Sequence, residues 1–182
     1  EIRQEFKNVI DWLKERACAR KSGLGTRLPW DNEWIIESLS DSVIYMAYYP
    51  LSKYISNDTN LQKSSDKVLA DDLNDAFFDY VLLGKNDMNV VARDSKISTE
   101  LLERIKNEFL YFYPVDSRHS GRDLIPNHLT FFIFNHTAIF PKDKWPKQIV
   151  VNGSVLMEGK KMSKSLGNII PLRQAIEEYG AD

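Results

Sequence analysis

Hydrophobic side chains recur at helical spacing in the first segment of the chain. Phe6, Val9 and Leu13 fall three or four residues apart, and charged residues fill the positions between them. An apolar stripe of this kind predicts an amphipathic helix over residues 2–17. A glycine-rich stretch then breaks the periodicity, and the continuous apolar run Trp34–Leu39 predicts a short buried strand.

The middle of the chain carries helical patterns on both sides of a polar stretch. Asp41-Ser42 can cap a helix that runs to about Ile55, and Pro50 should kink it. Ser56–Asp66 is polar and lacks periodicity, which predicts a loop. Two helices should follow, and their apolar positions are Leu69, Leu73, Phe77, Tyr80, Ile97, Leu101, Ile105, Phe109 and Phe112. We expect residues 56–113 to form a helical insertion.

The last third of the chain combines short strands with helices. Residues 115–117 predict a strand, Gly121 a tight loop, and the apolar stretch after Pro126 a buried helix. Two strand-like runs, 148–151 and 154–157, flank Asn152-Gly153, a sequence typical of a two-residue hairpin turn. A final helix should begin at Pro171 and end before Gly180.

Composition and charge narrow the class of protein. With 182 residues, 43% of them hydrophobic, the chain can bury a core. Its net charge of -2 provides no overall attraction to polyanions, so any contact with nucleic acid should be local. Cys18 is the only cysteine, which excludes an internal disulfide and fits a reducing, cytoplasmic compartment. We expect no secretion signal and no membrane span, because the apolar stretch Leu129–Phe140 is too short.

A glycine-bracketed basic loop is the strongest chemical feature. Residues 159–168 hold three lysines, Lys160, Lys161 and Lys164, with the hydroxyls of Ser163 and Ser165 between them. Lysine ammonium groups, hydroxyl donors and a closely approaching backbone suit a polyphosphate. From composition alone, a solvated basic turn fits equally well. A row of aspartates on a central helix, Asp72, Asp75 and Asp79, reads as a solvated face, and we expect no metal site.

The loop sequence Lys161-Met162-Ser163-Lys164-Ser165 matches the KMSKS motif of class I aminoacyl-tRNA synthetases without departure. The wider chain resembles the leucyl-tRNA synthetases of the archaeal and eukaryotic cytosolic type. Stretches that carry this resemblance are 23–31, 36–47 and 121–129. The resemblance implies an α/β fold in which residues 1–182 form the C-terminal half of a Rossmann-like catalytic domain, with a β-hairpin leading to the KMSKS loop.

Roles for the ATP-binding residues follow from the resemblance. Lys164 and Lys161 are implied to stabilise the triphosphate of ATP as catalytic residues, assisted by Met162 and Ser163. Gly121 and Asp123 match the family's Gly-x-acid element, in which the acid accepts hydrogen bonds from the ribose hydroxyls. Without the resemblance, Asp123 would be read as a turn-forming aspartate.

An amino-acid pocket is implied as well. His128 stands where leucyl-type enzymes place a pocket histidine, and Ser42 and Tyr45 align with residues that shape the leucine pocket. From the residues alone, a histidine beside an apolar helix is more often a structural hydrogen-bonding group, and a tyrosine at helical spacing from Tyr49 is ordinarily a core side chain.

The implied parent reaction joins leucine and ATP into leucyl-adenylate, followed by transfer to tRNA(Leu), with Mg²⁺ accompanying ATP. The family's second motif, His-x-Gly-His, does not occur in these 182 residues. We therefore expect a fragment of a larger enzyme that is inactive when isolated. The alternative is a noncatalytic module, derived from a synthetase, that binds RNA or another protein.

Overall fold

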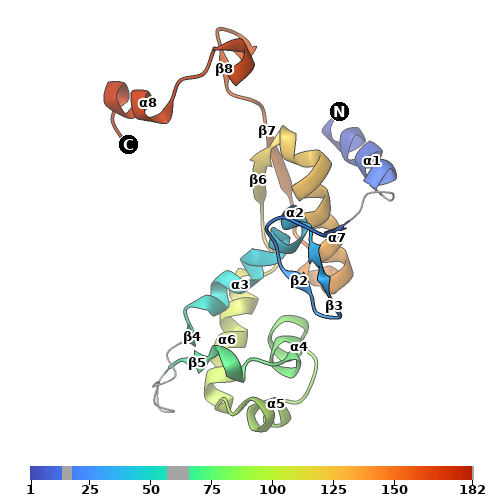
Figure 1. Ribbon diagram of the computed structural model, residues 1–182. Helices are drawn as coiled ribbons and strands as arrows, with labels where there is room; N and C mark the ends of the chain where they lie inside the picture. The colour runs from blue at the N-terminus through green and yellow to red at the C-terminus, as the bar shows by residue number, and fades with distance from the viewer. Residues whose placement is uncertain (14–17, 57–65, 182) are drawn as a thin grey trace.

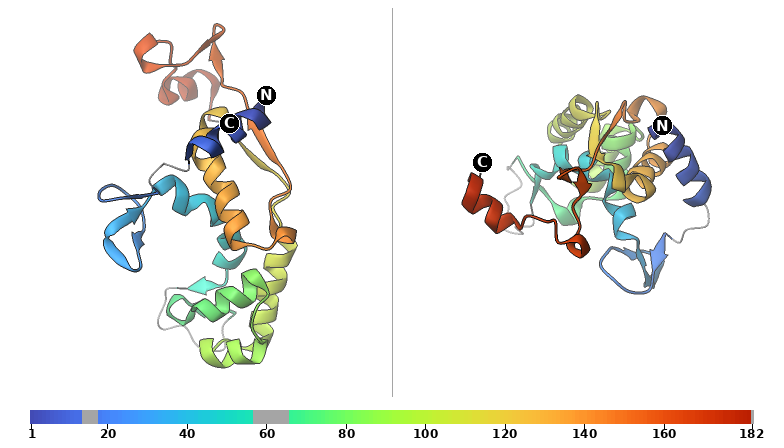
Figure 2. Two further views of the ribbon diagram at one scale, coloured as in Figure 1. Left: turned by 90° about the vertical axis from the view of Figure 1, so that its right-hand side faces the viewer. Right: turned by 90° about the horizontal axis from the view of Figure 1, so that it is seen from above.

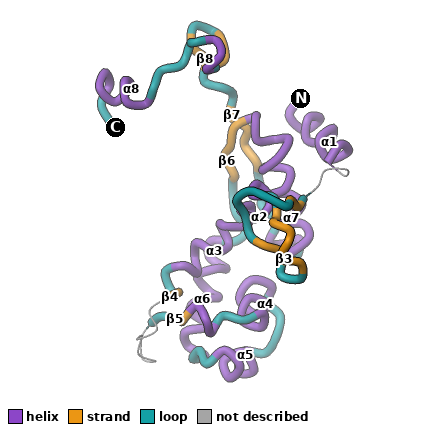
Figure 3. The backbone as a smooth tube through the Cα atoms, viewed as in Figure 1, coloured by secondary structure: helices purple, strands orange, loops and turns teal. Residues whose placement is uncertain are grey.

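The computed structural model describes residues 1–13, 18–56 and 66–181. Helices make up most of the body, and the strands are short (Figure 1, Figure 3). A cluster of helices lies at one end, a parallel strand pair with two helices lies in the middle, and the C-terminal segment projects beyond them (Figure 2). This mixture of helices and parallel strand pairs agrees with the predicted α/β class.

The first helix, α1 (Ile2–Leu13), is amphipathic as predicted, and Leu13 is its buried residue. Residues 14–17, the end of the predicted helix, lie outside the described part of the chain. Three strands follow as an antiparallel sheet in the order β1-β3-β2: β1 (Ala19–Arg20), β2 (Arg27–Leu28) and β3 (Asp31–Ile36).

The prediction of a buried strand over residues 34–39 is wrong in its bounds and its burial. β3 ends at Ile36 because the carboxylate of Glu37 accepts the backbone N–H of Leu39 at 2.9 Å and caps the next helix. β3 has three exposed residues followed by three half-buried ones. The following elements are α2 (Ser38–Asp41), the 3-10 turn η1 (Ser42–Ile44), α3 (Tyr45–Ser52), which contains Pro50, and β4 (Ile55–Ser56).

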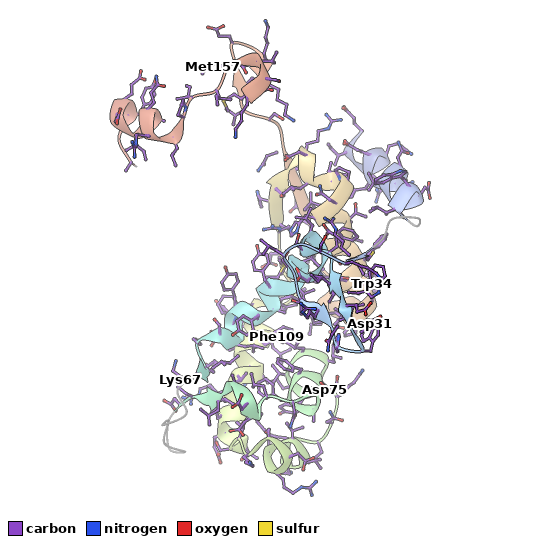
Figure 4. All side chains as sticks on the ribbon, in the orientation of Figure 1. Asp31, Trp34, Lys67, Asp75, Phe109 and Met157 are labelled. Atoms are coloured by element: carbon purple, nitrogen blue, oxygen red, sulfur yellow. The ribbon has the colours of Figure 1, made fainter. Side chains whose placement is uncertain are left out.

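The helical cluster begins after residue 65. Its elements are β5 (Val68–Leu69), which pairs with β4 in parallel, the 3-10 turn η2 (Ala70–Asp72), α4 (Asp75–Leu83), α5 (Met88–Ser95) and α6 (Thr99–Phe112). Buried side chains from α3, α4, α5 and α6 share one apolar core, in which Phe109 is fully buried (Figure 4). Whether residues 56–113 are an insertion stays a prediction.

Caps decide where these helices begin. α6 confirms its prediction, and the hydroxyl of Ser98 accepts the N–H of Leu101 at its start. The helix expected from Leu69 begins instead at Asp75, because the side chain of Asn74 accepts the N–H of Phe77 at 2.9 Å. The sequence analysis assigned no element to α5, which is capped by Asp87.

A parallel strand pair lies in the middle region. β6 (Arg118–Gly121) pairs with β7 (Ile149–Asn152), so that Gly121 lies opposite Asn152. The strand expected at 115–117 therefore begins three residues later, and Gly121 ends a strand rather than forming a tight loop. The chain continues from β6 through the 3-10 turn η3 (Arg122–Leu124), the π-helical turn η4 (Ile125–Leu129), the helix α7 (Thr130–Ile139) and the 3-10 turn η5 (Lys142–Lys144). The helix predicted after Pro126 is thus present, but it is only partly buried, because Phe134 and Ile139 are exposed.

The predicted hairpin at Asn152-Gly153 is wrong. β8 (Leu156–Met157) pairs antiparallel with β9 (Lys160–Lys161), whereas β7 pairs with β6. Glu158 and Gly159 have positive φ angles of 50° and 76°, the signs that a type I′ turn requires at both central positions. The segment ends with the 3-10 turn η6 (Lys164–Leu166) and the predicted helix α8 (Leu172–Tyr179), and it projects away from the body with Met157 near its tip (Figure 4).

No helix among the described residues is long and apolar enough to cross a membrane.

Candidate functional site

The acid of the Gly-x-acid element lies against its glycine. Gly121 is the last residue of β6, and Asp123 follows in η3. A Cβ atom built on Gly121 would lie 2.5 Å from Oδ1 of Asp123, so only glycine leaves room for the carboxylate in this position. Asp123 is exposed. An exposed carboxylate beside a bare backbone, at the carboxyl end of a parallel strand, is suited to accept hydrogen bonds from a ligand's hydroxyl groups.

Arg122, between these two residues, turns away toward α1. Its Nε donates to the carboxylate of Glu5 at 3.0 Å, and Nη2 lies 3.4 Å from that of Glu1. These contacts join η3 to the first helix. The guanidinium of Arg122 is therefore paired with α1 and not with the carboxylate of Asp123.

His128 is buried in the π-helical turn η4, with 7% of its surface exposed. Its Nε2 lies 3.1 Å from Nη2 of Arg118, and its ring also hydrogen-bonds the backbone of Leu39. Arginine can only donate, so Nε2 accepts and the ring proton resides on Nδ1. Burial and the charge of Arg118 lower the pKa of His128, and the Leu39 bond opposes them in part. The imidazole is therefore neutral at pH 7.

Tyr45 is joined to the same arginine. Nη1 of Arg118 donates to the Tyr45 hydroxyl at 2.9 Å, and the guanidinium carbon lies 5.7 Å from the centre of the tyrosine ring. The structure thus brings together two of the three predicted pocket residues, from α3 and η4. Ser42, the third, is exposed, and its hydroxyl donates to the carbonyl of Ser38 at 3.0 Å.

Arg118 is a residue of this group that no sequence pattern indicated. It stands three residues before Gly121 and ten before His128, at the first position of β6. Its local sequence pattern does not distinguish it, because its partners Tyr45 and His128 lie in other elements and become its neighbours only in the folded chain. Another histidine, His136 of α7, is fully buried and bonds the hydroxyl of Tyr113 at 2.7 Å, a structural role.

The KMSKS segment is held by its own short contacts. The side chain of Asn168 accepts the N–H of Ser163 at 2.9 Å and donates to the carbonyl of Lys161 at 3.2 Å. The hydroxyls of Ser163 and Ser165 lie 2.7 Å apart. These bonds close a compact loop, which Gly167 ends in a left-handed conformation.

The lysines of this loop are directed to solvent. Lys160, Lys161 and Lys164 are exposed and form no ion pair with any carboxylate of the described residues. Met162 is exposed as well. In the arrangement of Figure 1 the segment after β7 projects beyond the strand pair, apart from α3. The predicted ATP-binding residues therefore lie in two places. Gly121 and Asp123 lie at the carboxyl end of β6, and the KMSKS residues lie in the projecting loop.

The chain matches the family model of class I tRNA synthetases, described as those for I, L, M and V, over residues 4–182. The chain belongs to this family. The class I prediction made from the KMSKS motif is confirmed.

Three relatives resemble this synthetase segment over nearly all its length. Leucine--tRNA ligase of Archaeoglobus fulgidus is 54% identical over 180 residues, which are 99% of this chain and 18% of the relative. Leucine--tRNA ligase 2 of Sulfurisphaera tokodaii is 57% identical over 182 residues, and Leucine--tRNA ligase of Methanosarcina barkeri is 54% identical over 182 residues. Each of these two matches covers 100% of this chain and 18% of the relative. The chain thus spans under a fifth of the length of these relatives.

The described part of the synthetase contains no group of three or more His, Cys, Asp or Glu side chains that could hold a metal ion. Magnesium that accompanies ATP needs no such cage, since it commonly keeps water ligands and binds phosphate oxygens. The residues present are compatible with a metal that arrives with the nucleotide.

Proposed function

We propose that this chain is part of the catalytic domain of a leucine--tRNA ligase, which activates leucine with ATP and transfers it to tRNA(Leu). The observation that carries the proposal is the match of nearly the whole of this chain, at 53–57% identity, to proteins named leucine--tRNA ligase. We also propose that β6 and β7 belong to a Rossmann-like parallel sheet, that residues 56–113 are inserted into it, and that the enzyme acts in the cytoplasm.

The chemistry of the site supports adenylation. The leucine carboxylate would attack the α-phosphorus of ATP, the bond to the bridging oxygen would break, and pyrophosphate would leave. Such a reaction requires positioning and stabilisation of phosphoryl charge rather than a protein nucleophile. The exposed ammonium groups of Lys161 and Lys164, on a loop that projects from the body, suit closure over a triphosphate.

The ribose and amino-acid contacts would come from the body of the domain. Asp123 would accept the ribose hydroxyls beside Gly121, whose lack of a Cβ leaves the space. Tyr45 and the neutral imidazole of His128 would line the leucine side chain, and Ser42 would border the same pocket from η1. A neutral histidine suits an aliphatic ligand because a buried charge would disfavour it. Magnesium bound to ATP would neutralise phosphate charge.

Leucine-dependent exchange of pyrophosphate into ATP tests this function. The full-length protein that contains this chain should catalyse exchange with leucine in strong preference to isoleucine or valine. The 182-residue chain alone should not, because its loop can stabilise charge only on an ATP held by the rest of the site. A full-length protein that exchanges with none of these amino acids would contradict the proposal, and a preference for isoleucine or valine would correct its substrate.

Calorimetry separates this function from a noncatalytic role. We expect the full-length protein to bind a leucyl-adenylate analogue. Salt-sensitive RNA binding without any adenylate binding would instead identify an RNA-binding module. The net charge of -2 already counts against a dedicated RNA binder.

A further inference from the structure

Arg118 contacts both aromatic side chains of the proposed amino-acid pocket. Its Nη1 donates to the hydroxyl of Tyr45 at 2.9 Å, and its Nη2 donates to Nε2 of His128 at 3.1 Å. Tyr45 begins α3, His128 lies in η4, and Arg118 begins β6. One guanidinium therefore joins a strand to two helical elements that are 83 residues apart along the chain.

The two hydrogen-bond partners of the charged Arg118 side chain, Tyr45 and His128, are both neutral. It forms no ion pair with a carboxylate of the described residues, and its Nε is buried without a described hydrogen-bond partner. A guanidinium presents its donors in a fixed planar fork, so two partners held at once are fixed relative to each other. A lysine has no such fork and could not hold both in the same geometry.

The backbone of Leu39 also interacts with the His128 ring and partly opposes the lowering of its pKa. Leu39 is in turn held by Glu37, whose Oε2 accepts its N–H at 2.9 Å, and Glu37 is buried with Oε1 2.5 Å from Nη2 of Arg20. Arg118 can only donate, so Nε2 of His128 accepts and the ring proton lies on Nδ1. The contact with Arg118 therefore selects the tautomer of the imidazole.

We infer that Arg118 is a positioning residue that holds Tyr45 and His128 as one unit and thereby sets the shape in which the pocket recognises an aliphatic amino acid. This inference rests on the proposed function. Arg118 itself does not touch the ligand in this role. Its removal should loosen two walls of the pocket together, and the binding of leucine should suffer while the binding of ATP does not.

The test replaces Arg118 in the full-length ligase. Arg118→Met should raise the KM for leucine in pyrophosphate exchange by about 10- to 100-fold, the range expected on losing hydrogen bonds from a charged donor. The KM for ATP should change little, and the preference for leucine over isoleucine should fall. Arg118→Lys should restore leucine binding only in part. The matched control is Arg104→Met, which removes an arginine that also lies over a tyrosine ring, Tyr54, at 5.8 Å, but within the helical cluster.

A second variant isolates the shared arginine. Tyr45→Phe removes only the hydroxyl and should retain the fold, which keeps the inference testable if Arg118→Met does not fold. The Tyr45→Phe enzyme should show a raised KM for leucine. The double variant with Arg118→Lys should raise this KM by less than the product of the two separate fold-changes. Independent, multiplicative effects would overturn the inference.

The results of these experiments distinguish a failure of the Arg118 inference from a failure of the proposed function. A wild-type enzyme without leucine-dependent exchange would refute the proposed function. An active wild-type enzyme whose Arg118→Met variant keeps its leucine KM and its selectivity would refute the inference alone. Equal losses of leucine and ATP binding, with a lowered melting temperature, would assign Arg118 a merely structural role and also refute it.

Discussion

The carboxylate of Asp123 occupies the space that a side chain on Gly121 would need, with Oδ1 2.5 Å from an ideal Cβ. Gly121→Ala should therefore displace the carboxylate rather than the backbone, because Asp123 is exposed and free to rotate. We expect the KM for ATP to rise about tenfold, in line with losing a hydrogen bond to a charged acceptor. The melting temperature should barely change.

The matched control for this variant is Gly153→Ala. Gly153 has no atom within 4 Å of an ideal Cβ and no left-handed φ angle, so alanine should be accepted there without effect. Steady-state pyrophosphate exchange on the full-length enzyme measures both variants. An unchanged ATP KM in Gly121→Ala would show that the carboxylate position is irrelevant to the nucleotide.

Removing the acid itself should separate the two substrates. Asp123→Ala leaves the ribose diol without its acceptor and should weaken ATP binding more than leucine binding. Equilibrium binding of each substrate to the full-length enzyme measures this split. Asp143→Ala, which removes an exposed aspartate beside Lys144, serves as the control. Equal losses for ATP and leucine would argue against the ribose assignment.

Lys164 should matter most in the transition state. Its ammonium is exposed on a loop and unpaired with any described carboxylate, so it is free to meet the charge that shifts toward pyrophosphate. Lys164→Ala should slow adenylate formation by roughly 10² to 10³, the usual cost of losing one preorganised electrostatic partner. Leucine affinity should remain nearly intact.

Two further lysine variants sharpen this prediction. Lys164→Arg should recover only part of the rate, because a planar fork does not replace a compact charge at a phosphate. Lys160→Ala, outside the motif, should change little. Pre-steady-state adenylate formation compares all three, and an unchanged rate in Lys164→Ala would show that the loop is a solvated basic turn.

The buried pair Tyr113 and His136 should make stability depend on pH in two windows. Burial lowers the pKa of His136 below its usual 6.5 and raises the pKa of Tyr113 above its usual 10.0. Below about pH 6.5, the unfolded chain binds a proton that folded His136 does not, so stability falls as pH falls. Above about pH 10, the unfolded chain releases a proton that folded Tyr113 keeps, so stability falls as pH rises.

Denaturant unfolding at several pH values measures this dependence. In the acid window each pH unit should cost up to about 1.4 kcal/mol per histidine. His128, whose pKa is also lowered, contributes in the same direction. His136→Gln should therefore reduce the slope between pH 5 and 7 without abolishing it. An identical slope in His136→Gln would exclude the buried histidine as the cause.

Local patterns were sufficient to predict several of the helices and the family. The stripe over residues 99–112 and the proline and glycine that bracket α8 predicted these helices because their periodicity and caps are properties of neighbouring residues. The KMSKS sequence likewise predicted the family, since a run of five residues carries its own signature. α5 went unassigned although Asp87 is an ordinary N-cap, because its apolar stripe is short.

Strand partners and the pocket group were decided by the tertiary structure. The local pattern of residues 149–152 is the same whether the strand turns back at Asn152-Gly153 or lies beside β6, some 30 residues earlier. In the structure the strand pairs in parallel with β6. Arg118, Tyr45 and His128 meet for the same reason: a hydrogen bond between residues 73 apart in sequence leaves no periodic trace. The sequence by itself determined which residue types were present for the reaction, and packing decided which of them came within reach of one another.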